Sequence, residues 1–300
     1  WSETLNWISG GQIKIRKIGG GLKDFSPLED HEVAVCMVQT IERAGQLADP
    51  LLGSSGVVMV DEVHHLPATT WLETLNRCPS RYRFGLTATP ERSDGLEPVI
   101  RLAIGQEVFK MTSGELVDLG FLMKPIVQPV QTGVDIEIEK CLKRDNTINY
   151  SAAVSSLMKS NKRKKIIVAL ASLAFENGRS VLILLPRKKS TVEVSAMLNK
   201  AGFSAVSLTS QTALKNRSSI LKRVRQGERV IICATQLADE GLDLPCLDTL
   251  INASAGKAQG RAIQRAGRIM RIQEGKKKPI VFDLVDGQPF LSQWRSRLVA

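Results

Sequence analysis

Two adjacent carboxylates follow a short apolar run and could hold a divalent cation. Asp61 and Glu62 come directly after Val57–Val60, a run typical of a strand that is buried on both faces. Ligands of open α/β sheets bind at the carboxyl ends of such strands. Because Mg²⁺ takes oxygen ligands and bridges phosphate oxygens, the pair indicates a magnesium and phosphate site. An Asp-Glu pair after a strand is common, so these two residues alone leave the function open.

Three arginines in the second half recur with helical spacing. Arg265, Arg268 and Arg271 lie three residues apart, which places them on one broad face of a predicted helix. That face carries no acidic residue, so an anion has to balance its charge. Since a guanidinium group can bind phosphate oxygens through two parallel hydrogen bonds, a triphosphate is the anion that the pattern favours.

A third string, Thr87-Ala88-Thr89-Pro90, ends the apolar run Arg83–Leu86. Threonine followed by proline is also a common composition at the start of a helix, where the hydroxyl caps the first turn. Taken alone, the residues therefore leave a structural and a functional interpretation open.

A fourth string, Asp239–Pro245, follows the apolar run Val230–Cys233 and a threonine at position 235. Gly241 lets the backbone approach a phosphate closely, and Asp243 can accept a hydrogen bond from a ribose hydroxyl. The alternative interpretation is a glycine that caps a helix and an aspartate that lies on the surface.

The four strings occur in one order, and in that order the sequence resembles the superfamily 2 helicases and translocases. These are nucleic-acid motors that hydrolyse ATP between two RecA-like domains. The Asp-Glu-Val-His form of the first string and the extension Glu91–Gly95 are similar to the branch that contains xeroderma-B-type repair helicases, UvsW-like annealing helicases and restriction translocases. The resemblance covers nearly the whole chain, from about Trp1 to beyond Asp286.

The resemblance implies roles for residues of the first half. Asp61 would hold Mg²⁺, directly or through water, and Glu62 would orient and activate the water that attacks ATP. His64 would link this site to the second domain. Thr87 and Thr89 would couple hydrolysis to movement on nucleic acid.

In the second half the resemblance implies a nucleotide site. The residues with implied roles in catalysis are Gln264, Arg268 and Arg271, of which the two arginines would be arginine fingers. The residues implied to contact nucleotide are Gly241 and Asp243. Arg265 would complete this site as a partner of its acidic groups.

Contacts with the nucleic-acid backbone are implied for five further residues. Gln39 and Thr40 come at the end of the apolar run Val33–Val38, like the first-domain segment that touches the tracked strand. The others lie in the second half and are Arg187, Thr209 and Thr235. The implied partners and cofactors are therefore nucleic acid, with DNA favoured over RNA, together with ATP and Mg²⁺.

Short apolar runs alternate with longer segments of helical character, as in doubly wound α/β folds. We predict an α/β protein with two RecA-like domains, each a parallel sheet flanked by helices, and an ATP cleft between them. The predicted boundaries are 1–118 for a partial first domain, 119–160 for a connector carrying a strand and a helix, and 161–300 for the second domain. The predicted strands are Val33–Val38, Val57–Val60, Arg83–Leu86, Val181–Leu185, Val230–Cys233, Thr249–Ile251 and Ile280–Leu284.

The charge is distributed unevenly between the two halves. The whole chain has a net charge of +11 from 41 basic and 30 acidic residues. Residues 1–118 contain 11 basic and 16 acidic residues, a net of −5, which leaves 30 and 14 for residues 119–300, a net of +16. A second half that faces a polyanion is favoured over a merely solvated basic surface.

Composition limits the remaining possibilities. Hydrophobic residues at 43% and charged residues at 24% are typical of a globular protein, and the apolar runs are shorter than a membrane helix requires. The five cysteines have no CxxC spacing, which favours reduced thiols over a zinc site or disulfides. We expect a cytoplasmic protein, or a nuclear one in a eukaryote, without a structural metal.

No segment of the chain reads GxxxxGK[ST], the P-loop that binds ATP phosphates. We expect the chain to begin inside a larger motor, after the P-loop, and to be inactive alone. The alternative function is a module of helicase fold that binds nucleic acid and does not hydrolyse ATP.

Overall fold

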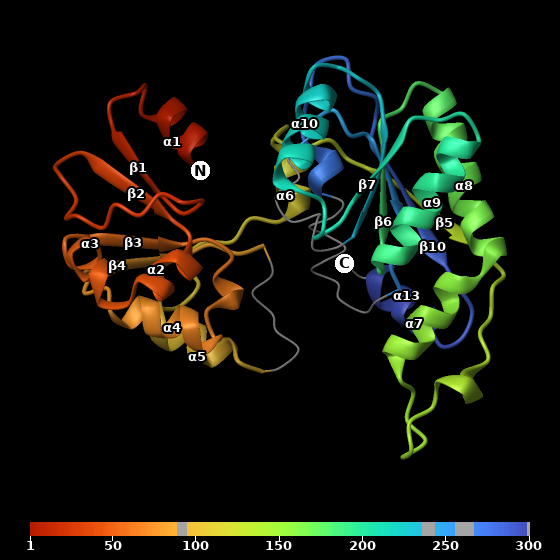
Figure 1. The fold of residues 1–300 in the computed structure, drawn as a ribbon, viewed down its shortest axis with the longest axis horizontal. Coiled ribbons are helices and arrows are strands. Elements are labelled where there is room, and N and C mark those ends of the chain that lie inside the picture. Colours follow the sequence, from red (N-terminus) through yellow and green to blue (C-terminus); the bar gives the residue numbers. More distant parts are fainter. Residues whose placement is uncertain (89–94, 236–243, 256–266, 299–300) are drawn as a thin grey trace. The chain divides into compact units, whose positions relative to one another are not determined.

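The computed structural model describes residues 1–88, 95–235, 244–255 and 267–298. The chain divides into two compact units, Trp1–Lys110 and Met111–Ala300 (Figure 1). The predicted boundaries at residues 118 and 160 stay predictions. In the described ranges, no helix is long and apolar enough to cross a membrane.

Unit 1 contains two separate pairs of parallel strands. β1 (Lys14–Ile18) pairs with β2 (Glu32–Cys36), and β3 (Val57–Val60) pairs with β4 (Tyr82–Gly85). The turn after β1 contains Gly19, Gly20 and Gly21, all with positive φ. The helices of the unit are α1 (Ser2–Ile8), α2 (Val38–Ala44), α3 (Asp49–Gly53), α4 (Thr69–Asn76) and α5 (Glu97–Ala103).

The β3–β4 pair buries one face within unit 1. Val58 and Val60 pack with residues of α4 and α5, and Figure 1 shows both helices on the same side of the strands. The side chains of the other face, Val57, Met59, Tyr82 and Phe84, are between 45% and 55% exposed. The prediction of strands buried on both faces is therefore wrong for this pair, because the described part of unit 1 has helices on one side of it only.

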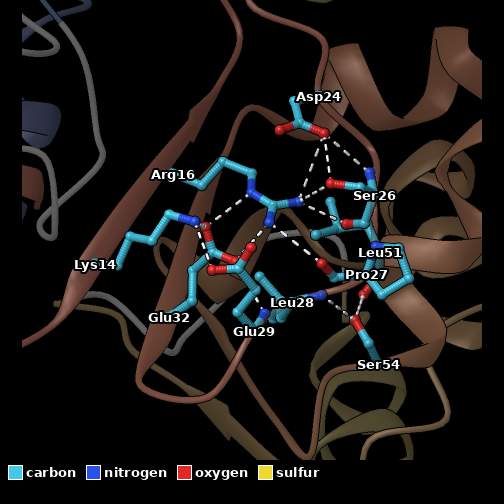
Figure 2. Close-up of polar contacts among 10 residues, drawn as sticks. All are labelled: Lys14, Arg16, Asp24, Ser26, Pro27, Leu28, Glu29, Glu32, Leu51 and Ser54. Carbon is cyan, nitrogen blue, oxygen red and sulfur yellow. Dashed lines mark hydrogen bonds and ion pairs between the residues drawn. The ribbon is translucent and has the colours of Figure 1, made fainter.

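A buried ion pair ties the loop between β1 and β2 to β1. The guanidinium of Arg16 binds both carboxylate oxygens of Glu32, with Nε 3.0 Å from Oε1 (Figure 2). It also donates to the carbonyl oxygens of Ser26 and Pro27. The Glu32 side chain is fully buried and the Arg16 side chain is 9% exposed. Paired and hydrogen-bonded in this way, two charges can be buried that would be costly alone.

Unit 2 is built on a six-stranded parallel sheet. The strand order is β5-β10-β9-β6-β8-β7, and every neighbouring pair is parallel. The strands are β5 (Ile126–Gln131), β6 (Val181–Leu185), β7 (Ala205–Leu208), β8 (Ile231–Thr235), β9 (Thr249–Asn252) and β10 (Ile280–Val285). The helices are α6 (Ser113–Asp118), α7 (Tyr150–Lys159), α8 (Asn161–Glu176), α9 (Lys188–Lys200), α10 (Leu214–Arg225) and α13 (Leu291–Leu298).

Helices cover both faces of this sheet. Ile183 and its neighbours on one face pack against α7, α8 and α9, whereas Leu182 and Leu184 on the other face pack against α10 and Ile269. Figure 1 shows α8 and α9 on one side of β6 and α10 on the other. Since successive side chains of a strand point to opposite faces, an uninterrupted apolar strand is what a doubly covered sheet requires.

Helix α8 begins with the basic cluster Lys162–Lys165, and within it the Arg163 side chain is buried. Its guanidinium binds both oxygens of Asp286 at 2.8 and 2.9 Å and donates to the carbonyl of Ala253 at 2.9 Å. Thr132 Oγ1 donates to the same carboxylate. This network joins the carboxyl ends of β5, β9 and β10 to the start of α8.

All seven predicted strands are present; Val57–Val60 and Val181–Leu185 have the predicted ends, and the other five are shifted. The largest difference is the run Val33–Val38, because β2 ends at Cys36 and α2 begins at Val38. β1 and β7 were not predicted: β1 alternates charged and apolar residues, and β7 is four residues long. The segment after α6 contains β5 and α7, a strand and a helix, and β5 joins the sheet of unit 2.

The ion pair of unit 1 predicts how stability depends on pH. Hydrogen bonds from the Glu29 backbone N–H and from Arg16 lower the pKa of Glu32 below its ordinary value of 4.5. A depressed carboxylate pKa stabilises the fold above the ordinary value and loses this effect as the pH falls through the folded-state value. We expect Glu32→Gln to lower the free energy of unfolding at about pH 7, by an amount that shrinks below about pH 4.5.

Urea denaturation of both proteins between about pH 3 and 8 measures this difference. Glu29→Gln is the matched control, because the Glu29 side chain is 67% exposed and pairs only with Lys14 among the ion pairs of the described residues. A Glu32→Gln deficit that stays constant down to pH 3 would contradict the assignment.

Candidate functional site

Asp61 and Glu62 lie at the carboxyl end of β3, where the sequence placed them. Asp61 Oδ2 accepts a hydrogen bond from Trp1 Nε1 at 2.8 Å, and its Oδ1 accepts from the backbone N–H of Glu62 at 2.9 Å. Both carboxylate side chains belong to exposed residues. The two donors fix the orientation of the Asp61 carboxylate, while its remaining lone pairs stay accessible to a cation.

Glu62 has a backbone conformation that a residue with a side chain seldom adopts. Its φ of 50° and ψ of 47° are left-handed, a conformation that costs about 1 kcal/mol or more for such a residue. The turn that follows, Val63–His65, is a short 3-10 helix closed by the bond from His65 N–H to the carbonyl of Glu62. The left-handed residue thus turns the chain sharply at the end of the strand.

This turn is tied to the end of β4. The backbone N–H of Val63 donates to the carbonyl of Leu86 at 2.9 Å, and that of Leu86 donates to the carbonyl of Val60 at 2.9 Å. His64 Nδ1 lies 3.0 Å from Thr87 Oγ1 and 3.3 Å from Glu62 Oε2. The structure therefore brings the first and third strings of the sequence into direct contact, through a histidine that touches both a carboxylate and a hydroxyl.

Packing holds the same two segments together. Val63 is 4% exposed and lies against Gly85, where a Cβ atom would come within 2.9 Å of Val63 Cγ2. Leu66 and Leu75 complete the buried cluster below the turn. Only a residue without a side chain fits at position 85 while Val63 keeps its place.

The donor set suits a magnesium ion that is shared with phosphates. Asp61 supplies an exposed carboxylate, and no group of three or more metal-binding side chains lies together among the residues that the structure describes. Mg²⁺ is commonly held by one or two carboxylates, water and substrate phosphates rather than by an all-protein cage. Asp61 fits such a site, with Glu62 beside it.

In unit 2, three predicted contacts follow strands that are neighbours in the sheet. Thr235 ends β8, Thr209 follows β7 and Arg187 follows β6 closely, so all three lie at the carboxyl edge. Arg187 Nη2 donates to the Ser151 hydroxyl at 2.7 Å, and Thr209 Oγ1 accepts from the Gln211 N–H at 3.2 Å. Thr235 Oγ1 is buried and has no hydrogen-bond partner in the described part of the chain.

The described end of the arginine helix comes before Arg271. Residues 267–270 are helical, with Ile269 and Met270 buried, whereas Arg271 lies beyond the helix in an isolated bridge with Leu122. The prediction that Arg268 and Arg271 share one helical face is therefore wrong at its carboxyl end, because pairing with another segment ends the helix.

Two contacts fix the backbone at Arg271. The N–H of Met123 donates to the carbonyl of Met270 at 2.7 Å, beside the bridge. Lys276 Nζ donates to the carbonyl of Arg271 at 2.7 Å. Burial lowers the pKa of Lys276 to about 8, and the charge of Arg271 acts in the same direction.

Other predicted site residues are placed differently or lie outside the description. Gln39 and Thr40 are in the first turn of α2 rather than at the end of a strand, because β2 ends earlier. The remaining predicted residues lie outside the described residues, and these are Thr89, Gly241, Asp243, Gln264 and Arg265.

Sequence reasoning missed three features of the site. The indole of Trp1 on Asp61 had no local signal, since 60 positions separate the two residues. The bridge of Leu122 to Arg271 likewise joins distant segments. Gly85 could have been found, because a glycine inside an apolar strand often marks a close approach of backbone.

Two family models match the chain. Residues 3–92 match the model described as type III restriction enzyme, res subunit, and residues 161–273 match the helicase conserved C-terminal domain. The chain is 29% identical over 245 residues to a protein described as helicase 22 of Sulfolobus islandicus filamentous virus, which covers 78% of this chain and 43% of that protein. It is 25% identical over 315 residues to the DNA 3'-5' translocase XPB2 of Sulfurisphaera tokodaii. That match covers 95% of this chain and 69% of the translocase.

Solved structures show the same fold. Dbp5 of S. cerevisiae bound to RNA and ADP BeF3 matches with a TM-score of 0.67 and 14% identity over 99% of this chain and 70% of that chain. The predicted α/β class with RecA-like domains and parallel sheets is confirmed at the level of each unit. The chain spans about half the length of the first curated relatives it matches, with 43%, 56% and 50% of those proteins covered.

The contact between Gly85 and Val63 predicts a rescue. We expect Gly85→Ala to lower the free energy of unfolding by about 1–3 kcal/mol, because the new methyl group overlaps Val63 in a packed cluster. Val63→Ala alone leaves a cavity and also destabilises the fold. The double variant should recover part of the Gly85→Ala loss, since the smaller side chain makes room for the methyl group.

Urea denaturation of the four proteins gives the coupling energy directly. Additive losses in the double variant would show that position 85 is not constrained by Val63.

Proposed function

We propose that this chain, which belongs to superfamily 2 of the helicases, forms the motor core of an ATP-dependent DNA helicase or double-strand translocase. One observation supports this most strongly. The exposed carboxylates Asp61 and Glu62 lie beside His64, which reaches Thr87 just after β4, so a site for phosphate chemistry is joined to a second segment. Such a connection is what coupling hydrolysis to movement requires.

In the proposed reaction, each residue of the turn has a separate task. Asp61 would hold the magnesium ion, which would supply positive charge to the phosphates of ATP. Glu62 would orient the attacking water and accept its proton. His64 contacts the Glu62 carboxylate and Thr87, so it can hold Glu62 in position and transmit a change there to β4.

The arginines would meet charge that develops on the transferred phosphoryl group. Arg268 lies in the helical residues 267–270, and Arg271 is held by its bridge and by Lys276. Guanidinium groups placed in this way stabilise the transition state of phosphoryl transfer more than they bind the ground state. Gln264, Arg265, Gly241 and Asp243 would complete the nucleotide site.

Hydrolysis also needs a P-loop, which the 300 residues do not contain. We propose that the P-loop comes from outside these residues and that the helix it leads into covers the open face of β3 and β4. The exposed side chains of that face support this, because parallel strands are ordinarily covered on both sides.

DNA is the proposed substrate. A relative over 95% of this chain is described as a DNA 3'-5' translocase. The net charge of +16 after residue 118 suits a phosphate backbone. Arg187, Thr209 and Thr235 would contact it at the carboxyl edge of unit 2, and Gln39 and Thr40 would contact it from the first turn of α2.

A second function is favoured by the missing P-loop alone. A chain of this fold could bind nucleic acid without hydrolysing ATP, and Asp61 and Glu62 would then be surface carboxylates. The two functions differ in ATP hydrolysis by the complete gene product.

The proposed role of Glu62 predicts a selective loss. In the complete gene product, Glu62→Gln should reduce DNA-stimulated ATP hydrolysis by about 10²–10⁴-fold, because the amide cannot accept the proton of the water. DNA binding and the melting temperature should stay near those of the parent, since the Glu62 side chain is about half exposed. Residues 1–300 alone should not hydrolyse ATP, because half of the phosphate-binding groups are absent.

Glu73→Gln on α4 is the matched control, because this exposed residue lies away from the turn. The proposal fails if Glu62→Gln hydrolyses ATP as fast as the Glu73→Gln control. Absence of ATP hydrolysis from the parent itself would favour the non-hydrolysing module.

A further inference from the structure

The two edges of the sheet in unit 2 carry different chemistry. Because all six strands are parallel, their amino-terminal ends lie together at the edge opposite Arg187, Thr209 and Thr235. The loops that enter β5, β10, β6 and β8 each bring basic residues to that edge, and β9 lies between β10 and β6. We define the amino-edge patch as Lys124, Arg179, Arg229, Lys277 and Lys278.

Backbone carbonyl groups hold several of these cations in place. Lys277 Nζ donates to the carbonyl of Asn177, just after the end of α8. Arg229 Nη1 donates to the carbonyl of Phe175 at 3.3 Å, and its guanidinium lies 4.7 Å from the centre of the Phe175 ring. Arg179 Nη1 donates to the carbonyl of Lys278 at 3.0 Å. Since carbonyl groups are neutral, they fix the positions of the cations without cancelling their charge.

Structural roles account for part of this arrangement. Basic side chains at the end of a helix stabilise it by binding its last carbonyl groups, as Lys277 and Arg229 do on α8. Lys124 and the Lys278 side chain have no such role among the hydrogen bonds and ion pairs of the described residues. They nevertheless lie in register, because Ile126 pairs with Ile280 across β5 and β10.

Few carboxylates balance the patch. Asp248, which precedes β9, lies 3.6 Å from Arg179 Nη1 and is the one acidic partner of the patch in the described residues. Glu228, beside Arg229, binds Arg223 instead. Glu176, at the end of α8, and Glu274, three residues before Lys277, are exposed, so the five cations still outnumber the three nearby carboxylates.

The extent of the patch suits a long, regular polyanion. Neighbouring strands are about 4.8 Å apart, so the four intervals from β5 to β8 span about 19 Å. One strand of duplex DNA advances about 3.4 Å per phosphate, and the row therefore faces about five or six phosphates.

The aromatic residues at this edge favour duplex over single-stranded nucleic acid. Sites for single strands combine cations with open aromatic faces on which bases stack. Here Arg229 lies over the Phe175 ring, and Phe203 packs edge-on against the same ring at 6.0 Å. An edge with cations and a covered ring can hold a backbone but offers little for unpaired bases.

We propose that the amino-edge patch binds the phosphate backbone of duplex DNA, at a surface separate from the carboxyl edge. The proposal rests on the proposed function in one respect, namely that nucleic acid is the polyanion that the chain engages. It does not require ATP hydrolysis. Duplex held at this edge would add contacts that do not depend on base sequence.

Charge reversal at the two unconstrained lysines tests the patch in the 300-residue chain. Lys124→Glu combined with Lys278→Glu should weaken binding of a labelled 20-base-pair duplex by about tenfold or more at low salt. The slope of log affinity against log salt concentration should become less negative by about 1.8, because two phosphate contacts are lost. Binding of a short single-stranded oligonucleotide should stay unchanged.

The matched control is Lys143→Glu combined with Arg144→Glu. Both residues are exposed in the turn between Leu142 and Ile148, and the pair changes the net charge by the same amount. We expect this control to change duplex affinity by less than about threefold. Melting temperatures near that of the parent would show that both variants are folded.

Each of the following results would overturn the proposal. Equal losses in the test and control pairs would show a general effect of net charge, and an unchanged duplex affinity would show that the patch is not used. Weaker binding of polyglutamate with unchanged duplex binding would assign the surface to an acidic protein. If the unmodified chain binds single strands but no duplex, this proposal fails while the proposed function stands, whereas binding of neither contradicts both.

Discussion

The contact of Val63 with Gly85 is the constraint on which the candidate site depends. It lets the chain turn at the end of β3 and lie directly on the end of β4, with Val63 N–H bound to the carbonyl of Leu86. The left-handed conformation of Glu62 follows from that turn, and the strain is tolerated because the buried valine and two backbone hydrogen bonds fix both ends. His64 then reaches Thr87, and the carboxylates remain at the surface.

The two edges of the parallel sheet in unit 2 carry different groups of residues. The carboxyl edge carries Arg187, Thr209 and Thr235, which are expected to contact nucleic acid, and the buried pair of Arg163 and Asp286 fixes the ends of three of its strands. The amino edge collects cations that carbonyl groups hold in place. A parallel sheet makes this division possible because all loops of one kind lie at one edge.

Much of the fold could be predicted because its signals are local. Apolar runs such as Val181–Leu185 and turns at glycine depend on neighbouring residues only, and all seven predicted strands are present. The features that the sequence did not predict depend on partners far apart in the chain. Arg163 is buried because Asp286 lies across the sheet, and Arg271 leaves its helix because Leu122 pairs with it. The exposed face of β3 and β4 depends on which helices pack against it. The pattern of side chains within one strand does not show which helices those are.

The central claim is that Glu62, His64 and Thr87 act as one unit, and a double-mutant cycle on DNA-stimulated ATP hydrolysis by the complete gene product tests it most directly. The account predicts that His64→Ala and Thr87→Ala each reduce the stimulation by DNA. It also predicts that the double variant is little worse than either single variant, with a coupling energy of about 0.5–3 kcal/mol. Additive losses, or single variants with undiminished stimulation, would contradict it.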